Sequence, residues 1–172
     1  MKYDIFISYR REGGSEFARS VKAALERKKY SVFLDFDELK DGKFDQRILD
    51  AIAEAPVFVF ILSPHSLDRC VNEGDWVRKE IEYAHSLGKQ IIPVNKDGDF
   101  EGLPAGLPEP LRTIFSTNQY SDIMVGQLFS DSVNKMIKDR IHPVIHCFRW
   151  LKMAFAAAVI LAAVITLIFA HD

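Results

Sequence analysis

The chain has few of the residues that build disulfide frameworks or metal sites. Its 172 residues include two cysteines, Cys70 and Cys147, which are too few and too far apart for either. Such sparing use of cysteine suits a reducing compartment. The five histidines show no metal-ligand spacing, so no metal is expected. A net charge of −2 argues against bulk electrostatic binding of nucleic acid.

Several motifs of catalysis, phosphate binding and secretion are also missing. There is no G-x-G-x-x-G and no G-K-[ST], so neither a Rossmann dinucleotide fingerprint nor a P-loop is present. Ser63 does not lie in a G-x-S-x-G nucleophile elbow. The first residues, M-K-Y-D-I-F-I-S-Y, alternate in polarity, and no signal peptide is expected from that pattern.

One long hydrophobic run is present at the C-terminus. Residues 151–170 read L-K-M-A-F-A-A-A-V-I-L-A-A-V-I-T-L-I-F-A, with one lysine and one threonine as the only polar members. A helix of that length spans about 30 Å, the hydrocarbon thickness of a bilayer. A buried core helix is the alternative, but the run is hydrophobic all round. Basic residues precede it, which predicts a tail anchor with residues 1–150 in the cytoplasm.

Strand-like and helix-like segments alternate before this run, which indicates an α/β fold. Five strands in a short chain favour the flavodoxin-like parallel sheet of order 2-1-3-4-5, with helices on both faces. A closing helix is expected over 123–141. The strands are expected at 3–9, 31–34, 57–62, 90–94 and 114–116. We therefore expect a domain at 1–141, a juxtamembrane linker at 142–150 and a transmembrane helix at 151–170.

In that strand order, a ligand crevice opens at the carboxyl ends of strands 1 and 3. Ser8-Tyr9-Arg10-Arg11 follows the first strand, and residues 63–75 follow the third. The two arginines precede a glycine pair and a helix start, an arrangement that suits a phosphate group. A solvated basic turn is the alternative.

Glu80 is an unexpected residue at its position in the helix that follows strand 3. At 100° per residue it lies on the apolar face, between Trp76 and Ala84. Either the carboxylate reaches water or an arginine at the rim of that face, or it is held half-desolvated to meet a cation, a hydroxyl or a developing positive charge. The pattern alone leaves both interpretations open.

Several linked segments resemble the Toll/interleukin-1 receptor (TIR) domain family over about residues 1–140. They are Y-D-I-F-I-S-Y-R-R, S-V-F-L-D-F-D-E-L-K-D-G-K-F, I-L-S-P-H-S-L-D-R-C and D-W-V-R-K-E-I. They are similar to the family's first strand, second strand with BB loop, third strand and W-x-x-x-E helix. The NAD-cleaving branch is the most similar. Lys40 departs from an acid in that branch, and the connection from Cys70 to Trp76 is shorter.

The resemblance implies cleavage of the nicotinamide–ribose bond of NAD+, which is the substrate, so no separate cofactor is expected. It makes Glu80 the catalytic residue. It also implies homo-oligomers formed by TIR–TIR contacts, with activity that rises on self-association. The substrate-binding positions are Tyr9, Arg10, Arg11, Gly42 and Trp76. The BB-loop positions used in assembly are Asp37, Lys40, Asp41, Gly42 and Lys43.

One carboxylate fits this chemistry, because nicotinamide in NAD+ is already cationic and leaves as a neutral molecule without a general acid. The oxocarbenium-like ribose is what needs a nearby anion or a transient covalent partner. The family implies a setting in defence or cell-death signalling. Two rivals remain open. One is a non-enzymatic adaptor that docks other TIR domains through residues 35–45, and the other is an effector whose oligomerising spans perturb the bilayer.

Overall fold

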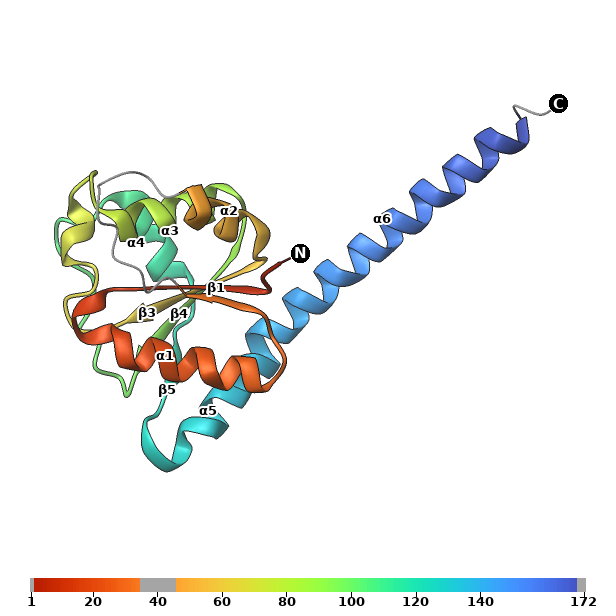
Figure 1. Cartoon of the computed structure of the whole chain (residues 1–172). Coiled ribbons are helices and arrows are strands. Elements are labelled where there is room, and N and C mark those ends of the chain that lie inside the picture. The colour runs from red at the N-terminus through yellow and green to blue at the C-terminus, as the bar shows by residue number, and fades with distance from the viewer. Residues whose placement is uncertain (1, 35–45, 170–172) are drawn as a thin grey trace.

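The structure is a computed structural model that describes residues 2–34 and 46–169 (Figure 1). The strands are β1 Ile5–Tyr9, β2 Val32–Leu34, β3 Val57–Leu62, β4 Gln90–Lys96 and β5 Ser121–Ile123. The α-helices are α1 Arg11–Arg27, α2 Gln46–Glu54, α3 Trp76–Ser86, α4 Glu109–Thr117, α5 Phe129–Met136 and α6 His142–Phe169. Shorter turns of helix are η1 Asp68–Val71, η2 Gly126–Leu128 and the π-type η3 Ile137–Ile141.

The five strands form one parallel sheet in the order β2-β1-β3-β4-β5, as the sequence predicts. β3 lies at its centre, and all six of its side chains are buried, which explains its unbroken apolar run. The register pairs Ser8 of β1 with Phe60 and Tyr9 with Ile61. The carboxyl ends of β1 and β3 therefore lie side by side.

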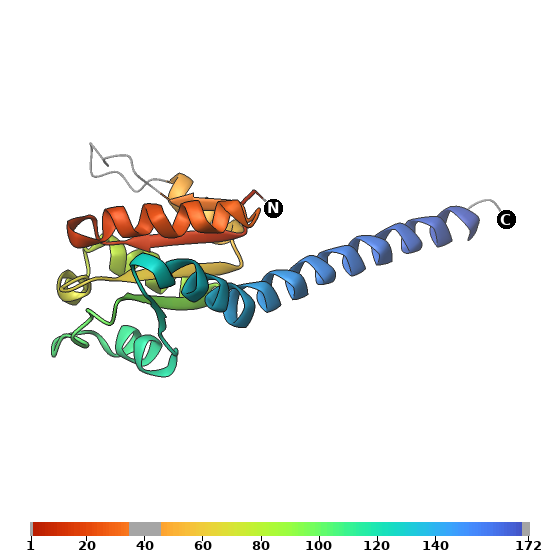
Figure 2. The same cartoon turned by 90° about the horizontal axis from the view of Figure 1, so that it is seen from below.

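Helices cover both faces of the sheet (Figures 1 and 2). An apolar cluster lies between the sheet and the helices on each face. On one face, α1, α5 and the start of α6 bury Ile7, Phe17 and Met136 against the strands. On the other face, α2, α3 and α4 bury Phe6 and Phe60. Because side chains alternate along β1, Ser8 points to the second face, toward α3.

The fifth strand differs from the sequence prediction. Residues 114–116, expected to be extended, lie in α4, and the edge strand is β5 instead. The reason is the spacing of the apolar residues: Leu111, Ile114 and Phe115 bury one helical stripe, with Pro110 in the first turn. β5 contributes only Ile123 to the core, which is too weak a signal to identify a strand from sequence. The closing α-helix accordingly begins later than expected, at Phe129.

Residues 142–150, expected to be a juxtamembrane linker, are helical and form the first turns of α6. Ile145 is buried against the domain, and Arg149 donates to both carboxylate oxygens of Asp4 at 2.9 and 3.0 Å. Beyond this anchorage α6 runs straight away from the sheet (Figures 1 and 2). The domain limits at 141, 150 and 170 stay predictions.

Within the described residues, one helical stretch, Gly126–Ile160, is long and apolar enough to cross a membrane by length and composition. Its outer part packs against nothing described in the domain: Phe155 is 73% exposed and Ile160 is 65% exposed. A helix that presents large apolar side chains all round is unfavourable in water, because every one of them stays hydrated.

Candidate active site at the ends of β1 and α3

Glu80 is held by a buried serine of the sheet. The hydroxyl of Ser8 donates to Glu80 Oε2 at 2.6 Å, a length typical of a hydroxyl bonded to a carboxylate. Ser8 is buried, and Glu80 is half-buried on α3, beside the buried stripe of Val77, Ile81 and Ala84. The carboxylate therefore points toward the sheet at the topological switch point rather than into bulk solvent.

A second polar contact ties the same two elements together. Arg10, two residues after Ser8, pairs with Asp75 through Nη1–Oδ2 at 2.8 Å and Nη2–Oδ1 at 2.9 Å. The two side chains are only 10% and 9% exposed. Asp75 is the N-cap of α3 and accepts the backbone N–H of Arg78 at 3.0 Å. The N-cap of α3 is thus fixed by the arginine that directly follows β1.

The electrostatics of this pair hold both groups in their charged forms. Burial alone would raise the pKa of the Asp75 carboxyl, but the hydrogen bonds from Arg10 and Arg78 and the charge of Arg10 lower it below its ordinary value. Burial works against the charge of Arg10 as well, yet its bonds to Asp75 raise its pKa. The guanidinium also donates through Nε to the carbonyl of Ser66 at 3.2 Å.

Cys70 completes this cluster as a neutral thiol. Its sulfur lies 3.5 Å from Arg10 Nη2 and 3.4 Å from Asp75 Oδ1. Burial and the neighbouring negative charge of Asp75 raise the pKa of the thiol to about 12. A buried thiol with a raised pKa is a poor nucleophile, so this cluster does not favour covalent chemistry at Cys70.

The predicted substrate-binding residues within the described part of the chain differ in their surroundings. The guanidinium of Arg10 contacts Asp75, Ser66 and Cys70 and so joins the end of β1 to α3. Its expected contact with the dinucleotide stays a prediction. Arg11 is exposed at the first residue of α1, and Tyr9 is half-buried at the end of β1. The half-buried Trp76 begins α3, one turn before Glu80, with Lys79 Nζ 5.2 Å from its ring centroid.

The expected BB-loop residues Asp37, Lys40, Asp41, Gly42 and Lys43 lie outside the described residues. Their assignment to substrate binding and assembly stays a prediction.

The turn between β1 and α1 packs closely against the ends of the neighbouring strands. Gly13 adopts a φ of +78°, which favours glycine, and it interrupts the helical conformation near the start of α1. A Cβ on Gly14 would lie 3.6 Å from the ring of Tyr9. Ser63, just past β3, faces this turn, and its buried hydroxyl has no hydrogen-bond partner among the described residues.

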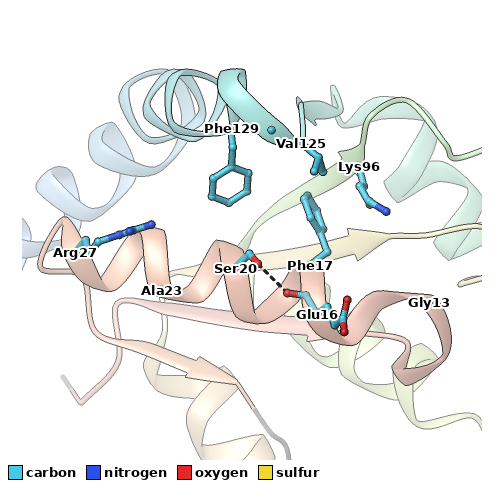
Figure 3. A pocket seen from close by; sticks show the side chains of 10 residues that line it. Gly13, Glu16, Phe17, Ser20, Ala23, Arg27, Lys96, Val125 and Phe129 are labelled. Atoms are coloured by element: carbon cyan, nitrogen blue, oxygen red, sulfur yellow. Dashed lines mark hydrogen bonds between the residues drawn. The ribbon is translucent and has the colours of Figure 1, made fainter.

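A separate cavity of about 530 Å³ lies on the opposite face of the sheet from Glu80. It lies between α1 and the segment that leads into α5 (Figure 3). The rings of Phe17 and Phe129 line it with their centroids 6.4 Å apart, and Arg27 and Lys96 also line it. Glu80 does not line this cavity, so it is distinct from the cluster around α3.

The sequence places Ser8 and Asp75 at the predicted crevice but does not predict the role of either. For Asp75 a signal existed, because an aspartate directly before a helix with apolar periodicity is a common N-cap. For Ser8 the signal was weaker: it is a polar residue in an otherwise apolar strand, next to the predicted crevice.

The strand order, the helices on both faces and the polar cluster at the carboxyl ends of β1 and β3 define a flavodoxin-like, doubly wound α/β domain. Within that class, the chain belongs to the TIR domain family, whose model matches residues 5–139. The resemblance seen in the sequence is thereby confirmed.

Relatives of known name agree with this assignment. The chain is 40% identical over 119 residues to NAD(+) hydrolase tir-1 of Caenorhabditis elegans, covering 67% of this chain and 12% of that protein. It is 37% identical over 118 residues to NAD(+) hydrolase SARM1 of Danio rerio, covering 67% of this chain and 16% of that protein. The chain therefore corresponds to a small part of the length of either relative.

A solved structure supports the fold. The TIR domain of the Toll-related receptor TRR-2 from Hydra magnipapillata is similar with a TM-score of 0.52 and 21% sequence identity, covering 84% of this chain and 98% of that one.

Proposed function

We propose that this protein is a TIR-domain enzyme that cleaves the nicotinamide–ribose bond of NAD+, with Glu80 as the catalytic residue. The observation that carries the proposal is the half-buried Glu80 carboxylate, which the buried hydroxyl of Ser8 holds at 2.6 Å beside the switch point of the sheet. The relatives named NAD(+) hydrolases support the substrate.

In the proposed reaction, the C1′–N bond breaks and its electron pair leaves with the nicotinamide, which neutralises the pyridinium. Positive charge then develops on the ribose, and the Glu80 carboxylate stabilises it or bonds to C1′ transiently. Water adds at C1′ and releases a proton, giving ADP-ribose. If an adenine nitrogen or a ribose hydroxyl of the same molecule attacks C1′ instead of water and loses its proton or positive charge, a cyclic product forms. The low local dielectric strengthens the attraction between carboxylate and ribose.

The surroundings of Glu80 suit this task. Arg10 and Asp75 fix the N-terminus of α3 to the end of β1, so the positions of Trp76 and Glu80 relative to the strand end are set before substrate arrives. Because the carboxylate is already oriented, no free energy is spent on reorienting it during the reaction. We propose that Trp76 contacts the bound substrate beside Glu80 and that Tyr9 and Arg11 contact the dinucleotide.

We further propose that α6 anchors the enzyme in a membrane and that self-association raises its activity. The exposed apolar side chains along α6 support the anchor. Confinement to a surface raises the effective concentration of the domains for one another.

One experiment tests the activity and its dependence on assembly together. The full chain is reconstituted into vesicles at constant total protein and increasing lipid, incubated with NAD+, and the products are separated by chromatography. The proposal expects nicotinamide together with either ADP-ribose or cyclic ADP-ribose, with a rate per molecule that falls as lipid dilutes the protein. No NAD+ consumption at any protein density in the membrane would favour the non-enzymatic docking adaptor. A rate per molecule that does not depend on this density would contradict activation by self-association.

A further inference from the structure

A groove lies where α6 leaves the domain. It has a volume of about 490 Å³ and is bounded by the turn between α3 and β4 on one side and the first turns of α6 on the other. Leu87 forms the apolar wall on the domain side, and Val144, Phe148 and Leu151 form it on the helix side. Leu87 is 43% exposed and Leu151 is 54% exposed, so the groove presents apolar surface to its surroundings.

Two lysines give this groove a positive charge. Lys89 lines it and donates to the carbonyl of Ala53 at 2.5 Å, and Lys152 Nζ lies 4.7 Å from the ring centroid of Phe148. Burial, followed by the positive charge of Lys152, lowers the pKa of Lys89. Among the described residues, no acidic side chain lies within ion-pair distance of either ammonium group. Two like charges without a counter-charge attract an anion.

The position of the groove indicates where that anion would come from. Leu151 both lines the groove and begins the apolar run 151–170. If this run enters the bilayer, as proposed above, the groove lies at the level of the lipid headgroups. The cytoplasmic leaflet, which the positive-inside rule assigns to this side, is the one that carries anionic lipids.

We propose that this groove binds an anionic phospholipid of the surrounding leaflet. The headgroup phosphate and carboxylate meet Lys89 and Lys152, and the upper part of an acyl chain lies against Leu87, Phe148 and Leu151. Such binding fixes the distance and tilt of the domain relative to the membrane. This inference depends on the proposed membrane anchor but not on the proposed NAD+ cleavage.

Trp150 provides the readout, because it lies within one turn of Phe148 and is exposed. The full chain carrying Trp76→Phe, which leaves Trp150 as its only tryptophan, is reconstituted into phosphatidylcholine vesicles. These contain an equal small fraction of either brominated phosphatidylserine or brominated phosphatidylcholine. The proposal expects stronger quenching by the serine lipid, with local enrichment of about fivefold for each lysine that faces the headgroup.

Two charge-matched variants locate the effect. Lys89→Gln with Lys152→Gln is expected to equalise quenching by the two lipids. Lys135→Gln with Lys138→Gln, which removes the same charge from exposed positions outside the groove, is expected to preserve the difference. If both double variants lose the difference between quenching by the two lipids, the preference comes from the overall surface charge. That outcome would contradict binding of a lipid in the groove.

Flotation of the same vesicles separates failure of the groove from failure of the anchor. If the protein floats with its vesicles but shows no preference for the anionic lipid, the groove proposal is wrong and the anchor stands. Quenching that is equal for both lipids and falls as protein density rises would mean that a second copy of the chain, and not a lipid, covers the groove. If the protein does not float, both proposals are wrong.

Discussion

Asp75 accepts from both terminal nitrogens of Arg10, at 2.8 and 2.9 Å, and from the backbone N–H of Arg78 at 3.0 Å. One carboxylate therefore joins the end of β1 to the first turn of the helix that carries Glu80. The pair is buried, so removing one partner leaves an uncompensated charge where water cannot solvate it.

The first prediction concerns the stability of this pair. Arg10→Met is expected to lower the free energy of unfolding by about 3–5 kcal/mol, because Asp75 is left buried and unpaired. Arg10→Met combined with Asp75→Asn is expected to lose less, since both charges are gone and asparagine still caps the helix. Chemical denaturation of the full chain in detergent measures both.

Glu26→Gln provides the control for that comparison. Glu26 pairs with Lys22 at 3.0 Å on the exposed surface of α1, and its loss is expected to cost less than about 1 kcal/mol. A double variant that is less stable than Arg10→Met alone would contradict the idea that the unpaired charge is what destabilises the fold.

The second prediction follows from the lowered pKa of Asp75. A carboxyl whose pKa is lower in the folded state contributes stability that is fully present above its unfolded value of 3.8 and is lost as pH falls through the folded value. The wild-type chain is therefore expected to lose stability in acid below about pH 4 more steeply than Asp75→Asn. Thermal melts between neutral pH and pH 3 measure how stability changes with pH in the two proteins. Equal slopes of stability against pH would contradict a lowered pKa of Asp75 in the folded state.

The third prediction separates the two cysteines. Cys70 is buried with a thiol pKa of about 12, whereas Cys147 is exposed on α6. Iodoacetamide at pH 8 is expected to modify Cys147 in the detergent-solubilised protein and to leave Cys70 intact until the domain unfolds. Mass spectrometry of peptides after timed labelling reads both sites. Equal rates at the two cysteines would mean that the cluster around Arg10 opens readily.

The fourth prediction concerns Ser8 as a positioning residue. Ser8→Ala removes the donor at 2.6 Å from Glu80, so the carboxylate loses a charge-assisted hydrogen bond worth roughly 1.5–3 kcal/mol. We expect kcat for NAD+ cleavage to fall by about 10- to 100-fold, with a smaller change in KM. Ser20→Ala, on the exposed face of α1, is the matched control and is expected to keep wild-type rates. An unchanged kcat with lowered stability would make Ser8 a purely structural residue.

Much of the fold could be predicted from sequence because its strongest signals are periodic. The buried run Val57–Leu62 and the apolar spacing in α1 indicated strands alternating with helices, which favoured a parallel sheet covered on both faces and the order 2-1-3-4-5. The edge strand was misplaced, because Ser121–Ile123 has one buried residue while Ile114 and Phe115 have β-like composition but helical spacing.

The site was only partly predictable, since pairing across the fold depends on geometry that spacing does not encode. Glu80 stood out as a charge on an apolar face, and the structure confirms that it is half-buried. Arg10 appeared suited to a phosphate group because it follows a strand and precedes a helix. The packing of α3 against the end of β1 shows that its guanidinium pairs with Asp75, a contact that sequence spacing does not indicate.

The central claim is that the Glu80 carboxylate stabilises positive charge on the ribose during bond cleavage. Its most direct test is the rate of NAD+ consumption by vesicle-bound full chain carrying Glu80→Gln, beside Glu82→Gln on the same helix. Because glutamine keeps the shape but removes the charge, Glu80→Gln is expected to lower kcat by about 10²–10³-fold or more, while Glu82→Gln stays near the wild-type rate. A Glu80→Gln protein that consumes NAD+ as fast as the wild-type chain would contradict the account.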